Sequence, residues 1–161
     1  MYLYEGGEMN AYNRHKTIEA QAQWQKEQNY THFGTATFNF INTLNGEKAL
    51  KTLSYFFNCV DRQIYKHKGV KEGKRVKRMV YLEKGRSREN LHTHFFYKAD
   101  TVEDAEQIGE IMKGIWQSKI KEANDIQIID NTKAKDNRHA YAMKEHYKID
   151  DDIYQPKLSV L

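Results

Sequence analysis

The chain has 161 residues and a mass of 19.1 kDa, which is the size of a single domain around one core. Its formal net charge is +4, and its one cysteine, Cys59, excludes an intrachain disulfide and any zinc or iron–sulfur site built from several cysteines. No apolar run reaches the ~20 residues that a membrane span needs, and the first residues form no basic or apolar leader segment. We therefore expect an intracellular protein with no membrane partner.

The first half of the chain predicts a helix, a strand and a second helix. Residues 14–28 lack Gly and Pro and are rich in helix-forming residues. Residues 32–40 are rich in Thr and Phe, as strands are. Between residues 47 and 66, apolar side chains recur at spacings of three and four, which is typical of an amphipathic helix packed on a core. A basic loop with two glycines follows at residues 68–74.

The second half predicts a hairpin, a helix, a short strand and a last helix. Residues 76–83 alternate between apolar and polar, and residues 91–98 form the next strand after a polar connection. Residues 101–121 begin with a capping-box pattern and acidic side chains, and continue with a helical apolar stripe. Residues 125–129 predict a strand, and residues 136–148 predict the last helix.

This order of elements predicts an α+β fold. Its centre, β-α-β-β-α-β, is the split β-α-β arrangement of ferredoxin-like and RRM-like folds, in which an antiparallel sheet carries its helices on one face. The other face is then free for chemistry or for nucleic acid. We assign residues 1–30 to a peripheral helical segment, residues 31–148 to the domain itself, and residues 149–161 to an irregular tail.

Basic residues concentrate between Arg62 and Arg88. Eleven bases stand there against two acids, so this segment carries a charge of +9 and the rest of the chain −5. Such a patch indicates a polyanionic partner, although a solvated loop and helix end would explain the same charges. The candidate nucleic-acid contacts are Lys68, Lys71, Lys74, Arg75, Lys77, Arg78, Arg86 and Arg88.

Two histidines and a glutamate form a candidate metal site. His92 and His94 flank Thr93, so both imidazoles leave the same face of a strand. Glu83 ends the preceding strand, and it points to the open face if the aliphatic residues of that strand face the helices. Two imidazoles and a carboxylate suit Mn²⁺ or Mg²⁺ holding a phosphate. Surface histidines, and a salt bridge of Glu83 to a neighbouring base, are the alternative interpretation.

A candidate nucleophile lies in the last predicted helix. Tyr141 and Lys144 are three residues apart and share a helix face. A tyrosine becomes a covalent nucleophile once its phenol is deprotonated, and a nearby ammonium favours the phenolate and holds a phosphate. The chain has eleven tyrosines, so for this motif alone a half-buried tyrosine beside a surface lysine is the more common alternative.

Together, these motifs resemble those of the HUH endonucleases, in particular the rolling-circle replication initiator (Rep) nickase domains with one catalytic tyrosine. The motifs stand in the family's order within residues 31–148: Phe33 to Asn39, His92-Thr93-His94 with Glu83 one strand earlier, and Tyr141-Ala142-Met143-Lys144. Two features depart from the family. Thr93 replaces a bulky apolar residue, and the chain has no phosphate-binding loop of a helicase.

The resemblance implies metal-dependent, sequence-specific nicking and joining of single-stranded or hairpin origin DNA, which starts the rolling-circle replication of a plasmid or virus. It implies that Glu83, His92 and His94 hold Mn²⁺ or Mg²⁺. It also implies that Tyr141 attacks to leave a 5′-phosphotyrosine and a free 3′-hydroxyl, while Lys144 steadies the phosphate or the leaving oxygen. Unwinding would then need a separate or host helicase.

Other interpretations stay open. A small HUH transposase or relaxase uses the same chemistry, although a relaxase more often offers three histidines. A non-enzymatic RRM-like nucleic-acid-binding module explains the basic patch and the element order, but it does not explain why Glu83 meets the two histidines. Tyr81, Phe96 and Phe33 are candidates for stacking on unpaired bases, with burial in the core as the alternative.

Overall fold

The computed structural model describes residues 11–39, 46–84, 91–131 and 154–161. In chain order the elements are α1 (Ala11–Glu27), β1 (His32–Phe38), α2 (Gly46–Lys71), β2 (Lys77–Lys84), β3 (Leu91–Lys98), α3 (Val102–Lys119) and β4 (Ala123–Asp130). The last predicted helix, residues 136–148, lies outside the described residues. None of these helices combines the length and the apolarity that a bilayer-spanning segment needs.

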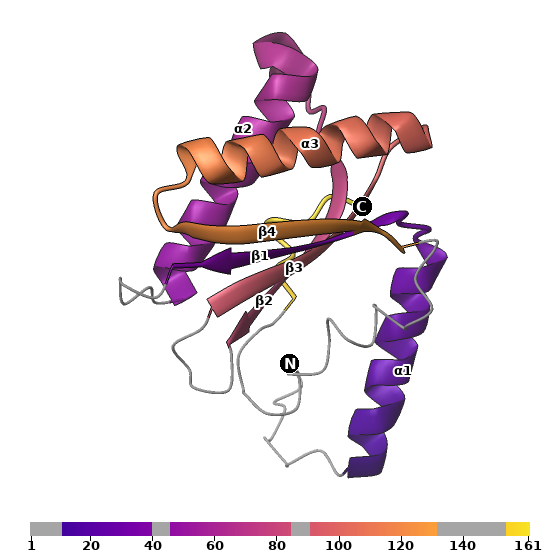
Figure 1. Ribbon diagram of the computed structural model, residues 1–161. Helices are drawn as coiled ribbons and strands as arrows, with labels where there is room; N and C mark the ends of the chain where they lie inside the picture. The colour runs from indigo at the N-terminus through magenta and orange to yellow at the C-terminus, as the bar shows by residue number, and fades with distance from the viewer. Residues whose placement is uncertain (1–10, 40–45, 85–90, 132–153) are drawn as a thin grey trace, which may run out of the picture.

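The four strands form one antiparallel sheet in the order β2-β3-β1-β4. β2 and β3 pair as neighbours along the chain, and β3 pairs on its other side with β1. The long helices α2 and α3 lie together on one side of the sheet, whereas α1 extends from the other side (Figure 1). The chain is therefore an α+β domain with an antiparallel sheet, as predicted.

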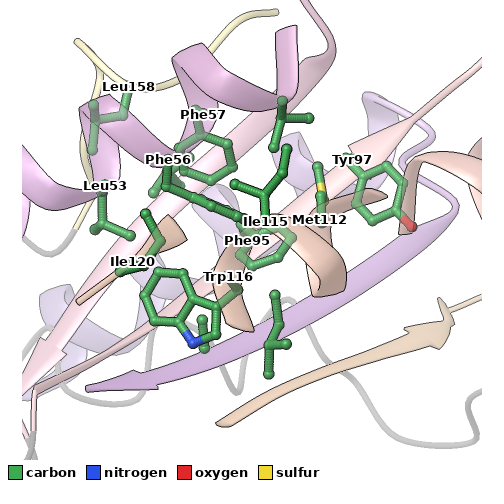
Figure 2. Packing of buried hydrophobic residues seen from close by; sticks show 14 of the residues in the cluster. Leu53, Phe56, Phe57, Phe95, Tyr97, Met112, Ile115, Trp116, Ile120 and Leu158 are labelled. Carbon is green, nitrogen blue, oxygen red and sulfur yellow. The ribbon is translucent and has the colours of Figure 1, made fainter. Parts of the chain in front are cut away.

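The core lies between the sheet and the helices α2 and α3, and aromatic rings fill its centre (Figure 2). Phe56 contacts Phe57 at 4.9 Å and Trp116 at 5.1 Å between ring centroids, and Phe57 contacts Phe95 at 5.6 Å. Edge contacts of this kind add about 0.5–1.5 kcal/mol each to the gain from burial. The Phe95 ring occupies the space above Gly34, where an added Cβ would lie 2.1 Å from it. This close approach explains a glycine inside β1.

Strand alternation separates the two faces of the sheet, as the sequence predicted. Val80 and Leu82 pack into the core on the helix side. Met79, which precedes Val80, and Tyr81, which lies between Val80 and Leu82, belong to a smaller cluster on the opposite face. This cluster also contains Tyr30, Phe33 and Phe96. Glu83 follows the same alternation and lies on this opposite face, which is called the site face below.

The site face is less open than predicted, because the end of α1 and residues 154–161 pack against it and against β2. The Gln25 side chain is 1 % exposed and donates a hydrogen bond to the Tyr81 hydroxyl. Val160 and Arg78 exchange two backbone hydrogen bonds of 2.8 Å, so residues 154–161 protect the edge of β2. The packed unit thus extends beyond the predicted domain boundaries of 31–148 at both ends.

The helix α2 is longer than predicted. It runs on to Lys71 and so includes the first part of the predicted basic loop at residues 68–74. Lys66 has non-helical dihedral angles (φ 60°, ψ 175°), so the run is interrupted where the apolar stripe of the sequence ends. The apolar pattern located the packed part of the helix, and the polar extension beyond Lys66 has no such pattern.

Candidate metal centre

The pairing of β2 with β3 brings Glu83, His92 and His94 together on the site face. Glu83 lies directly opposite His92, and His94 lies two residues further along β3. Successive residues of a strand point to opposite faces, so the two histidines share a face with Glu83. The predicted site requires a register of β2 against β3 that places Glu83 beside the histidines. The structure has this register.

The three side chains converge on one carboxylate oxygen. Oε2 of Glu83 lies 3.1 Å from Nε2 of His92 and 2.8 Å from Nε2 of His94. The side chains of Glu83 and His94 are each 2 % exposed, whereas that of His92 is 19 % exposed. The cluster is therefore buried on the inside and accessible from the side of His92.

The environment of Glu83 keeps it ionised. Burial by itself would raise the pKa of the Glu83 carboxyl, but the hydrogen bonds of His92 and His94 and their positive charge hold this pKa well below its ordinary value. A carboxylate that is already deprotonated binds a cation without first releasing a proton. Glu83 is thus in the form that a metal ligand requires across the neutral pH range.

Two residues of β1 hold the His94 ring in place. Thr35 lies opposite His94 in the β1–β3 pairing, and its Oγ1 is 3.0 Å from Nδ1 of His94. The Phe33 ring stacks on the imidazole at 5.4 Å with an interplanar angle of 18°. A hydrogen bond at Nδ1 orients the ring so that Nε2 points to Glu83, as outer partners of metal-bound histidines do. No local pattern pointed to Thr35, because the pairing of β1 with β3 joins residues 59 positions apart.

Thr93, the polar residue between the two histidines, lies on the helix side of β3. It is fully buried, and its hydroxyl donates a hydrogen bond of 2.8 Å to the backbone oxygen of Tyr81. A buried hydroxyl with a partner avoids the cost of an unsatisfied polar group. The polar residue between the two histidines is therefore satisfied by the neighbouring strand.

The donor set fits a divalent ion. One atom from each of Glu83, His92 and His94 lies within 4.8 Å of the others, and the described residues contain no other such group of three His, Cys, Asp or Glu. Metal bonds of about 2.0–2.2 Å place the ligands of one ion roughly 3–4 Å apart, so small side-chain adjustments suffice. Two imidazoles and one carboxylate on one side leave further coordination positions for water or a substrate.

The predicted catalytic pair and part of the basic set lie outside the described residues. These are Tyr141, Lys144, Arg86 and Arg88. Their assignment depends on the sequence motif and on the charge pattern alone.

The basic residues before β2 are not brought to the metal centre. Lys68 and Lys71 end α2, which packs on the other face of the sheet, and Lys74 and Arg75 follow it. Lys77 begins β2, whereas Glu83 stands near its end, and the strand between these two residues spans about 20 Å. These bases therefore lie at the opposite end of β2 from Glu83, and their assignment as nucleic-acid contacts stays a prediction.

Arg78 is a structural residue and is not available to a phosphate. It is 6 % exposed, and its Nη1 lies 3.0 Å from both carboxylate oxygens of Asp61. Its Nε donates to the backbone oxygen of Leu158 at 2.9 Å. Arg78 shares the helix-side face of β2 with Val80, and this alternation explains why a residue of the basic run is buried.

The three aromatic residues proposed for base stacking are also buried. Tyr81, Phe96 and Phe33 are 1 %, 0 % and 4 % exposed, so none of them presents a ring face to solvent. Trp24 in α1 is an exposed aromatic side chain on this side of the molecule, and it contacts the ring of Tyr154. No sequence pattern pointed to this pair, because its members are 130 positions apart.

Comparison with protein-family models, with curated proteins and with solved structures finds no match to this chain.

Proposed function

We propose that the protein is a metal-dependent nickase and strand transferase of the HUH type that acts on single-stranded or hairpin origin DNA. The observation that carries this proposal is the convergence of Glu83, His92 and His94 on one buried point of the site face. The strand order β2-β3-β1-β4, with α2 and α3 on one face, supports a ferredoxin-like arrangement with the site on the other face.

The ion, its ligands and Thr35 have distinct tasks in this proposal. Mn²⁺ or Mg²⁺ held there would supply positive charge to the oxygens of the scissile phosphate. Glu83 binds as a carboxylate, and Thr35 keeps Nε2 of His94 directed inward. His92, the most exposed ligand, stands on the side from which a phosphate enters.

The sequence motif supports Tyr141 as the nucleophile. Its phenolate oxygen forms a bond to phosphorus while the bond from phosphorus to the 3′ oxygen breaks, and that oxygen takes up a proton. Lys144 stabilises the charge on the phosphate or on the leaving oxygen. The phosphotyrosine ester conserves the energy of the broken bond, so a 3′-hydroxyl can reverse the step and join strands without ATP. In a replicating plasmid or virus, a separate helicase would unwind the DNA.

The structure disfavours a simple RRM-like binding module. Modules of that kind stack bases on exposed aromatic rings of the sheet. Here Phe33, Tyr81 and Phe96 are buried, and the partly exposed side chain of the metal centre on this face is His92, which is no aromatic stacking platform of that kind. A transposase or relaxase of the same type remains the alternative, because it would use the same ligands and the same ester.

A search for a covalent adduct tests the proposal. The full chain is incubated with random single-stranded DNA and Mn²⁺, and a denaturing gel separates any protein–DNA ester. We expect an adduct that is lost in Tyr141→Phe and in His94→Ala but kept in the matched variant Tyr147→Phe. An adduct that persists in Tyr141→Phe would show that Tyr141 is not the nucleophile. The absence of both the adduct and Mn²⁺ binding in the wild type would overturn the enzymatic proposal.

A further inference from the structure

Three aromatic rings connect the metal centre to the surface. Tyr81 is the cross-strand partner of His94 and is buried. The ring of Tyr154 lies 5.5 Å from that of Tyr81, and the ring of Trp24 meets Tyr154 edge-to-face at 6.2 Å. Exposure increases along this row, from 1 % at Tyr81 through a half-buried Tyr154 to 37 % at Trp24.

Each ring is held by interactions of its own segment. The Tyr81 hydroxyl accepts a hydrogen bond from Gln25, which fixes the end of α1 against β2. Tyr154 forms a backbone bridge with Tyr81, and the next residue, Gln155, donates 2.8 Å to the backbone oxygen of Val80. The outer pair of the row, Trp24 and Tyr154, is therefore positioned before any ligand arrives, and such preorganisation lowers the cost of binding.

We infer that Trp24 and Tyr154 form a stacking platform for an unpaired nucleobase of the single strand whose phosphate the metal centre holds. This inference rests on the proposed function and names a further part of the same site. The inner end of the row, Tyr81, lies opposite His94 in the β2–β3 pairing, so the row starts next to the metal centre on the site face. A nucleobase is flat and aromatic, so it can stack on the exposed ring of Trp24 whatever its sequence.

Trp24 provides its own probe for this contact. The chain has two tryptophans, and the other, Trp116, is fully buried in the core on the helix side. A base that stacks on the platform should quench the fluorescence of Trp24 and leave that of Trp116 unchanged. The metal used is Mg²⁺, because Mn²⁺ quenches fluorescence by itself.

The full chain is titrated with an oligothymidylate single strand and, separately, with a duplex of equal length. We expect quenching by the single strand only, and loss of this signal in Trp24→Leu with a fall in affinity of about 5- to 150-fold, which corresponds to one stacked base. Trp24→Phe retains a ring and should recover most of the affinity. Tyr12→Leu removes a ring that is 65 % exposed on the same helix but outside the row, and should bind like the wild type.

Several results would overturn the inference: no quenching in the wild type, equal quenching by the duplex, or equal affinity in Trp24→Leu. Thermal melts and Mg²⁺ titration of each variant establish that the fold and the centre are intact. The test of the nickase proposal is independent of this one. Quenching without any Tyr141-dependent adduct refutes the nicking chemistry and keeps the platform, whereas an adduct with an unchanged Trp24 signal keeps the nickase and refutes the platform.

Discussion

Replacing Thr35 by valine should weaken metal binding without changing any ligand. Valine keeps the size and shape of threonine but removes the hydroxyl that lies 3.0 Å from Nδ1 of His94. Of the two contacts from β1 to the His94 ring, only the stacking of Phe33 then remains. Stacking restricts rotation of the ring in its own plane less than the hydrogen bond does. The imidazole would spend less time with Nε2 directed at the ion.

The expected magnitude follows from the burial of this contact. His94 is 2 % exposed, so the lost hydrogen bond is poorly replaced by water and costs about 1–3 kcal/mol. Outer partners of metal-bound histidines typically account for about 10- to 100-fold in affinity, which is the same range. We therefore expect the Kd for Mn²⁺ to rise about 10- to 100-fold in Thr35→Val.

Thr37→Val is the matched control. Thr37 lies on the same strand and the same face, opposite His92, but its hydroxyl is bonded to the backbone of Asp125 at 3.1 and 3.4 Å. Calorimetric titration of both variants with Mn²⁺ measures the difference. An unchanged Kd in Thr35→Val, or an equal loss in Thr37→Val, would refute the reasoning that the Nδ1 contact orients the ligand.

Three further predictions concern stability. Asp61→Ala should lower the free energy of unfolding by about 3–5 kcal/mol in chemical denaturation, because the buried guanidinium of Arg78 loses its carboxylate; a loss below about 1 kcal/mol would contradict this. Gly34→Ala should cost about 1–3 kcal/mol in the same assay, since its Cβ would lie 2.1 Å from the Phe95 ring, and a wild-type midpoint would mean that the ring moves freely. Burial raises the pKa of Tyr30 from 10.0 to about 12, so the contribution of its neutral phenol to the free energy of unfolding is complete below pH 10 and is lost as the pH rises to about 12. In alkaline melts, the free energy of unfolding of Tyr30→Phe should therefore fall less than that of the wild type, by up to about 3 kcal/mol.

Periodicity along the chain was sufficient to locate the elements of the described residues. The predicted strand at residues 91–98 coincides with β3, and the predicted helix and strand that follow overlap α3 and β4 with small differences at their ends. The alternation in β2 also assigned Val80 and Leu82 to the helix side correctly. These features are local, because the pleat of a strand and the turn of a helix set the direction of each side chain from its neighbours.

Half of the metal centre is equally local. The two histidines share a face because one residue separates them, whatever the rest of the chain does. Their meeting with Glu83 depends on the register of β2 against β3, and a shift of one residue would have sent Glu83 to the helix side. The sequence placed Glu83 at the end of the right strand, and the pairing decided that it faces His92.

Local sequence patterns were thus enough to predict the α+β class, the positions of the described elements and the faces on which their side chains lie. Which of those faces meet depends on the strand order and on the packing of the helices. The tertiary structure buried Arg78 against Asp61, separated the bases near Lys71 from the metal centre, and brought Thr35 to His94 and Trp24 to Tyr154. The physical reason is that these contacts join segments that are distant in the chain, so they depend on strand order and packing, whereas the local pattern of each segment is the same before and after they form.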